Sequence, residues 1–164
     1  EVESMAKMVL KYRFRKVVDV VPGGRLRQDS VQSGLRLISD GIVAIHDGVR
    51  PFITKALLQK GIKLCRRYKA VVFGLPVSET IKKVNGHRVI KTVARGDLYA
   101  IQTPQFFDVK LLKMAYKKSG IQHREFTDDA AVVENAGHPV YIFEGLIQNI
   151  KITYRKQLQR IDKI

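Results

Sequence analysis

The fold of this chain is decided by the stretch Ile42-Val43-Ala44-Ile45-His46-Asp47-Gly48-Val49-Arg50-Pro51. Its apolar start predicts a short buried strand, which breaks at once into a carboxylate, a glycine, an arginine and a proline. In an open parallel sheet, ligands bind outside the carboxyl ends of the strands. There, Asp47 can hold a hard cation and Arg50 the anion that carries it. A surface turn with a local ion pair is the alternative, and this stretch alone leaves both open.

Outward from this stretch, apolar strands alternate with segments of helical spacing. This alternation predicts one α/β domain over residues 1–164, built on a mostly parallel sheet. The expected helices are 1–12, one capped by Asp29 or Ser30, one after Thr54, one after Asp108, 127–135 and a tail from Arg155; the expected strands are 17–21, 42–46, 70–74, 101–107, 140–143 and 150–153.

The pattern changes over residues 79–94. Two alternating strands flank Asn85-Gly86, which is a strong hairpin-turn signal. The hairpin is polar on both faces, and a two-stranded hairpin is marginal on its own. We therefore expect a protruding arm that docks on a partner surface.

The composition narrows the class of protein. The chain carries 30 Lys+Arg against 15 Asp+Glu, a net charge of +15, which favours an anionic partner such as a nucleotide, a phosphorylated metabolite or nucleic acid. One cysteine excludes an internal disulfide and suits a reducing cytoplasm. No apolar run is long enough for a transmembrane helix, so we expect a cytoplasmic protein without a membrane partner.

Polar side chains recur where predicted strands end or helices begin. Each has a plain structural explanation, because hydroxyls and carboxylates cap helices and charged side chains on a hairpin face water. Their joint recurrence favours a site made of Ser30, Asp47, Arg50, Thr80, Arg95, Thr103, Thr127, Asp128, Asn149 and Lys151.

Five motifs follow one another at suitable spacing. They are Gly23-Gly24-Arg25 with Asp29-Ser30-Val31, the 46–52 segment His-Asp-Gly-Val-Arg-Pro-Phe, the 102–107 segment Gln-Thr-Pro-Gln-Phe-Phe, the 126–130 segment Phe-Thr-Asp-Asp-Ala and the 149–153 segment Asn-Ile-Lys-Ile-Thr. From about Val17 to its end, the chain resembles the 2-C-methyl-D-erythritol 4-phosphate cytidylyltransferases of the non-mevalonate isoprenoid pathway.

The resemblance implies a Rossmann-like nucleotidyltransferase sheet whose arms pair across a homodimer. It implies that the phosphate of the sugar alcohol attacks the α-phosphate of CTP, with Mg²⁺ as cofactor and pyrophosphate as leaving group. The implied roles are catalysis by Lys151, Arg95 and Thr80, substrate binding by Arg50, Thr103, Thr127 and Asp128, nucleotide binding by Gly23, Gly24, Ser30 and Gly48, and metal binding by Asp47.

One family feature is not found in this sequence. The family begins with a strand and a glycine-rich loop that grips the triphosphate, whereas here no G-x-G-x-x-G or Walker sequence occurs. We therefore expect a domain that is incomplete at its N-terminus and inactive by itself. The alternatives are a ribitol 5-phosphate cytidylyltransferase, a non-catalytic dimerising module and a basic nucleic-acid-binding module. The last lacks zinc ligands and a helix-turn-helix pattern, so we expect no specific nucleic-acid partner.

Overall fold

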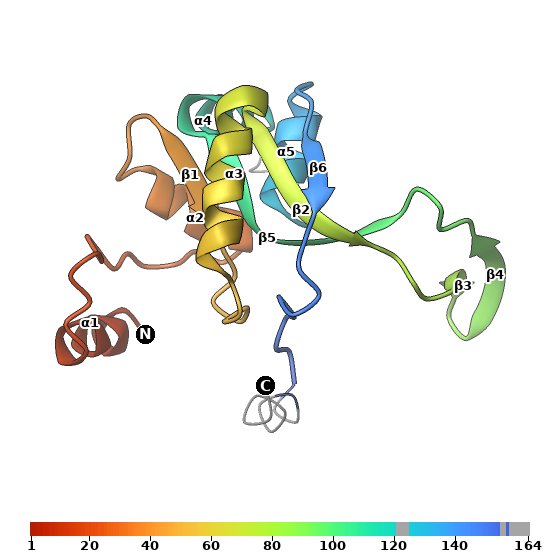
Figure 1. The fold of residues 1–164 in the computed structure, drawn as a ribbon, viewed down its shortest axis with the longest axis horizontal. Helices are drawn as coiled ribbons and strands as arrows, with labels where there is room; N and C mark the ends of the chain where they lie inside the picture. Colours follow the sequence, from red (N-terminus) through yellow and green to blue (C-terminus); the bar gives the residue numbers. More distant parts are fainter. Residues whose placement is uncertain (121–124, 155–156, 158–164) are drawn as a thin grey trace.

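The computed structural model describes residues 1–120, 125–154 and 157, which form a mixed α/β arrangement (Figure 1). In chain order the elements are α1 (Val2–Lys11), α2 (Arg27–Leu35), β1 (Ile42–Ile45), α3 (Lys55–Tyr68), β2 (Ala70–Pro76), β3 (Ile81–Asn85), β4 (Arg88–Val93), β5 (Tyr99–Asp108), α4 (Val109–Lys118), α5 (Asp129–Asn135) and β6 (Tyr141–Glu144).

The main sheet has the strand order β1-β5-β2-β6. Strand β5 is antiparallel to β1 and β2, and only the β2–β6 pair is parallel. The expectation of a mostly parallel sheet is therefore wrong for the pairing. The reason lies in the arm: the chain leaves β2, forms the hairpin and returns directly as β5, and such a return gives an antiparallel neighbour. The pairing of Pro76 with Tyr99 continues outward as a hydrogen bond from Val77 N to Leu98 O.

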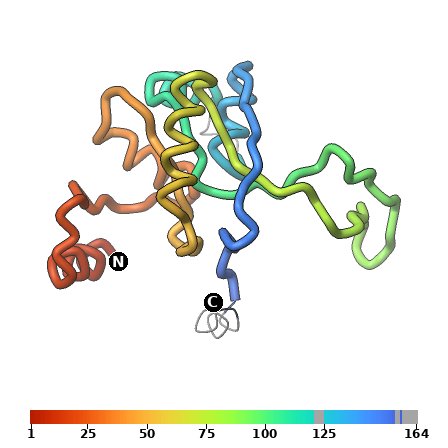
Figure 2. The backbone as a smooth tube through the Cα atoms, in the orientation of Figure 1, coloured from red at the N-terminus to blue at the C-terminus, as the bar shows by residue number. Residues whose placement is uncertain are grey.

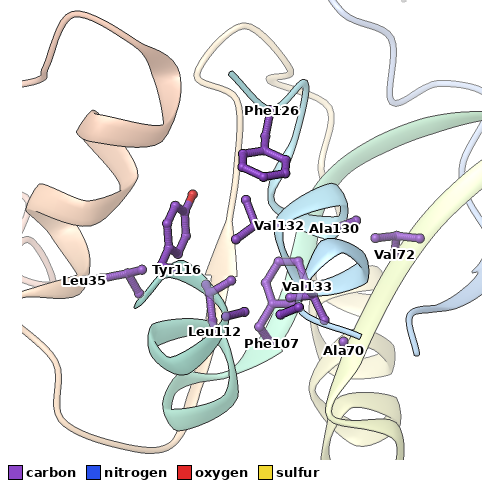
Figure 3. Packing of buried hydrophobic residues seen from close by; sticks show 12 residues of the cluster. Leu35, Ala70, Val72, Phe107, Leu112, Tyr116, Phe126, Ala130, Val132 and Val133 are labelled. Carbon is purple, nitrogen blue, oxygen red and sulfur yellow. The ribbon is translucent and has the colours of Figure 1, made fainter. Parts of the chain in front are cut away.

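Two apolar clusters cover the two faces of this sheet. Successive side chains of a strand point to opposite faces, so Phe106 joins a cluster with α3, whereas Phe107 joins α4 and α5 in the cluster of Figure 3. Helix α3 lies close to the sheet at Gly61, where an added Cβ would stand 2.3 Å from the Phe106 ring. Full burial of each phenylalanine stabilises the fold by about 1.5–3 kcal/mol.

The expected helix caps are partly confirmed. The side chain of Thr54 accepts from Leu57 N, and that of Asp108 accepts from Leu111 N, as expected. Helix α2 begins earlier than expected, at Arg27, because Asp29 bonds back to the amide of Leu26 from inside the first turn. The helix expected over residues 127–135 is α5, and its cap is Asp128 rather than Thr127. The side chain of Asp128 accepts a hydrogen bond from Ala131 N.

Two expected strands are not formed. Residues 17–21 lie outside any sheet, and Val18 is 96% exposed, because no neighbouring strand pairs with them. Residues 150–153 do not form a strand: Ile152 N donates to Val49 O at 2.9 Å, and Ile150 N donates to the nearby Gln148 O at 2.8 Å. Helix α1 forms as expected but buries none of its residues. Most of the expected helical tail from Arg155 lies outside the described residues.

The expected hairpin is confirmed. Strands β3 and β4 pair antiparallel around Asn85-Gly86, where Gly86 has the positive φ (55°) that favours glycine. The hairpin projects from the body on the side opposite α1 (Figures 1 and 2). Within it, only Ile81 and Val93 are half-buried, and the other side chains of both strands are exposed. The docking of this arm on a second chain stays a prediction.

Candidate active site

Several segments meet where β1 ends. The loop from His46 to Pro51 follows β1, and Thr103 comes from the adjacent strand β5. Lys151 lies beyond the end of β6, and Arg27 opens α2. These segments converge on the carboxylate of Asp47, as the contacts below show.

Three cations surround Asp47. Lys151 Nζ lies 3.2 Å and Arg50 Nε 3.7 Å from Oδ2, and Arg27 Nε lies 4.0 Å from Oδ1. The carboxylate is largely buried, with 18% of its side chain exposed, whereas 48% of the Lys151 side chain remains exposed. The site therefore carries an excess of positive charge, which suits an anionic ligand.

A chain of hydrogen bonds fixes the loop. Asp47 N donates to Thr103 Oγ1 at 2.9 Å, and that hydroxyl lies 3.1 Å from His46 Nδ1. The Nε2 of His46 lies 2.9 Å from the carbonyl of Arg50, which can only accept, so this nitrogen donates. Arg50 Nη1 donates to the carbonyl of Asn149, whose side-chain amide donates to the carbonyl of Thr103, both at 2.8 Å. The predicted site residues Arg50 and Thr103 are thus part of the loop's support.

The predicted nucleotide-binding segment forms a compact turn beside Arg27. Gly24 N donates to the hydroxyl of Ser30 at 3.0 Å. A Cβ on Gly23 would stand 2.9 Å from that hydroxyl, and one on Gly24 would stand 2.1 Å from Asp29 Cβ. The close approach to Asp29 requires glycine at position 24, and the turn depends on this close packing.

A second carboxylate lies behind the first. Asp129 is fully buried, and its Oδ2 lies 2.6 Å from Arg27 Nη1, while the hydroxyl of Tyr116 donates to Oδ1 at 2.6 Å. Sequence reasoning missed both Arg27 and Asp129, because no local pattern links residues so far apart in the chain. The neighbouring Asp128 is half-buried and accepts from Gln105 Nε2 at 2.7 Å, whereas Thr127 is exposed.

The predicted arm residues do not join this cluster within one chain. Thr80 is exposed just before β3, and Arg95 donates to the carbonyl of Ser78 across the base of the arm. The hydroxyl of Ser78 donates to Glu79 at 2.8 Å, and this bond is the main cause that lowers the pKa of the Glu79 carboxyl. These contacts tie the arm to itself.

The residues present suit a metal ion only when it arrives on a phosphate chain. In the described ranges, no three His, Cys, Asp or Glu side chains gather to hold a metal. Mg²⁺, however, keeps waters and often takes one or two carboxylates together with substrate phosphates, a pattern that Asp47 fits. The buried Oδ1 of Asn149 has no hydrogen-bond partner among the described residues.

None of the helices in the described part of the chain is long and apolar enough to cross a membrane.

An α/β sheet with cations and one carboxylate at a strand end is typical of proteins that bind phosphorylated ligands. The sequence model of the 2-C-methyl-D-erythritol 4-phosphate cytidylyltransferases matches residues 1–164, and the chain belongs to this family. The resemblance stated from the motifs is thereby confirmed.

Individual relatives agree with the family. The 2-C-methyl-D-erythritol 4-phosphate cytidylyltransferase of Halalkalibacterium halodurans is 40% identical over 159 residues, 96% of this chain and 70% of its own length. That of Clostridium novyi is 43% identical over 159 residues, with 96% and 68% covered. The solved structure of the Thermus thermophilus protein of that name matches with a TM-score of 0.80 and 33% identity, over 87% of this chain and 70% of that one.

Proposed function

We propose that this chain transfers a cytidylyl group from CTP to 2-C-methyl-D-erythritol 4-phosphate. A phosphate oxygen of the sugar alcohol forms a bond to the α-phosphorus of CTP. The bond between that phosphorus and the oxygen that bridges to the β-phosphorus breaks, and pyrophosphate leaves with the electron pair. Family membership supports this reaction. The observation that carries it is the excess of cations around one carboxylate at a strand end, Asp47.

The chain's own residues would act by binding and orientation. Lys151, half-exposed and 3.2 Å from Asp47, is placed to take a phosphate oxygen, and preorganised cations of this kind stabilise charge that develops on a transferring phosphoryl group. Gly23, Gly24, Gly48 and Ser30 would line the nucleotide. Mg²⁺, held by Asp47 when bound with the triphosphate, would neutralise phosphate charge.

The sugar-alcohol side of the site would be shared between two chains. Thr127 and Asp128 would bind the substrate from one chain, with Arg50 and Thr103 supporting the loop beneath it. Thr80 and Arg95 would come from the arm of the partner chain, so the active form would be a homodimer. The hydrogen bond that Arg95 donates to Ser78 within its own arm is compatible with such sharing.

The test protein is an extended chain, in which the 164 residues follow the N-terminal segment of the Halalkalibacterium halodurans relative. We expect this protein to release pyrophosphate from CTP only when 2-C-methyl-D-erythritol 4-phosphate and Mg²⁺ are present. We expect the 164 residues alone to be inactive, because the family's glycine-rich loop is not in their sequence. Turnover of D-ribitol 5-phosphate in place of methylerythritol phosphate would support the alternative cytidylyltransferase, and a folded extended chain without either activity would refute the proposal.

A further inference from the structure

A buried network of three side chains lies behind the candidate site. Tyr116 comes from α4, Asp129 from the first turn of α5 and Arg27 from the first position of α2. The tyrosine hydroxyl donates a hydrogen bond to Oδ1 of Asp129, and Arg27 Nη1 forms an ion pair with Oδ2, both at 2.6 Å. The buried carboxylate is therefore hydrogen-bonded through Oδ1 and paired by charge through Oδ2.

The position of Arg27 is unfavourable for its own helix. The first turn of a helix carries a partial positive charge, so a cation there is destabilised. The carboxylates of Asp129, 2.6 Å from Nη1, and of Asp47, 4.0 Å from Nε, offset this cost. The two carboxylates, rather than the helix, therefore account for an arginine at this place.

The two oxygens of Asp47 have different partners. Oδ1 lies 4.0 Å from Arg27 Nε, on the edge of the guanidinium that does not contact Asp129, whereas Oδ2 lies near Arg50 and Lys151. A separation of 4.0 Å is an ion pair rather than a hydrogen bond, so Arg27 attracts Oδ1 by charge.

We propose that Arg27 is a positioning residue: anchored by Asp129 and Tyr116, its guanidinium holds Oδ1 of Asp47 so that Oδ2 is presented to Lys151 and to the metal-bound phosphates. This inference rests on the proposed function, because it takes Asp47 as the residue that holds Mg²⁺ on CTP. It extends the site to three residues, Arg27, Asp129 and Tyr116, that touch neither substrate nor metal.

A double-mutant cycle on magnesium CTP binding tests the inference. Calorimetry on the extended chain would compare the parent with Asp47→Asn, Arg27→Gln and the two combined. We expect Arg27→Gln to weaken magnesium CTP binding about tenfold, the size of one lost charge contact, and to change the affinity for metal-free CTP much less. In the Asp47→Asn background, Arg27→Gln should have almost no further effect, because the residue through which it acts has lost its charge.

Each outcome distinguishes the inference from the function on which it rests. If the effects of the two substitutions on binding simply add, Arg27 does not act through Asp47 and the positioning role is wrong, while the proposed function stands. If Asp47→Asn binds magnesium CTP like the parent, the metal role of Asp47 in the proposed function fails first, and the positioning role fails with it.

Arg27→Gln leaves a buried carboxylate without its cation, and the variant could fail to fold. The double variant Arg27→Gln with Asp129→Asn removes both charges together, and the hydroxyl of Tyr116 can still donate to the amide oxygen. It should keep the fold and still lose about tenfold in magnesium CTP affinity. The matched control is Arg36→Gln, at the other end of the same helix, where the side chain is exposed and binding should not change. Parent-like binding by the double variant would overturn the inference.

Discussion

The Asp47 loop and the arm carry similar polar side chains, yet the chain holds them in different ways. Asp47 lies within 4.0 Å of three cations, and its amide is bonded to a buried threonine of the central strand. Thr80 and Arg95 are exposed residues that flank the two strands of the hairpin, just before β3 and just after β4. A single chain therefore preorganises the side chains around Asp47, whereas under the proposed function the arm residues join a site only in contact with a partner chain.

Deletion of the arm is expected to have the largest effect on activity and on the oligomeric state. Deletion of residues 82–91 from the extended chain, closed by a short turn, should leave a folded protein that is monomeric by light scattering and inactive. The deletion removes Val84, Val89 and Ile90, three apolar side chains that are each more than half exposed and that a partner chain would cover. A dimer that survives the deletion would show that the arm is not the interface.

Mixing two inactive variants sharpens this comparison. If the arm crosses between chains, a heterodimer of Arg95→Ala and Thr127→Ala contains one site with both lesions and one with neither. Random exchange between two such populations should then restore about a quarter of the parent activity, because half the dimers are mixed and half of their sites are intact. No recovery after verified subunit exchange would place each site within one chain.

Within the body, we expect Asp47→Asn and Lys151→Ala to lower kcat/KM by roughly 10- to 150-fold each. A charge-assisted contact to a phosphate or metal is worth about 1.5–3 kcal/mol, and these groups lie at a strand end, away from the apolar clusters. The melting temperature of Lys151→Ala should stay close to that of the parent, because the lysine is half-exposed, whereas Asp47→Asn should lower it, because its partner cations are partly buried. The matched controls are Asp40→Asn and Lys63→Ala, both exposed; a similar loss in the controls would attribute the effect to net charge.

Substitutions at Thr103 and Thr127 separate a role in holding the Asp47 loop from a role in binding the substrate. Thr103→Val should cost about 1–3 kcal/mol of unfolding free energy, because the amide of Asp47 and the ring of His46 lose a buried partner. Thr127→Val, at an exposed position, should change stability by less than about 0.5 kcal/mol while lowering activity. Urea denaturation of both variants checks this, and equal stability would mean that the Thr103 hydroxyl is not what holds the loop.

The smallest expected effect is the weak binding of nucleic acid that the net positive charge causes. Dispersed lysines give weak attraction to any polyanion, which falls steeply with salt. Duplex DNA should therefore shift on a gel at low ionic strength and not at physiological salt, and removal of the arm, with Lys82, Lys83, Arg88 and Lys91, should weaken even that binding. Sequence-dependent binding at physiological salt would instead favour the nucleic-acid module.

Local signals in the sequence predicted local structure well. The caps Thr54 and Asp108 and the turn Asn85-Gly86 follow from a few adjacent residues and are confirmed. The strand expected at 17–21 failed because a strand also needs an edge to pair with, which its own residues cannot supply. The direction of β5 was missed for a similar reason: it depends on how the arm returns the chain beside β2.

The same distinction holds for the site. A strand that breaks into His46-Asp47-Gly48-Val49-Arg50 predicted the position of the carboxylate, and Lys151 does lie beside it. Arg27 and Asp129 were missed, because only the folded chain brings the first turns of α2 and α5 within reach of an ion pair. The roles of the predicted residues toward substrate, nucleotide and metal stay predictions.

The bond from the Asp47 amide to Thr103 also has a kinetic consequence. Loop amides usually exchange their protons with water quickly, because a small local opening exposes them. This proton is held by a side chain of β5, which pairs with both β1 and β2. Its exchange should therefore keep pace with the slow amides of the central strands, so that a single deuterium label inside the site reports how often the whole sheet opens.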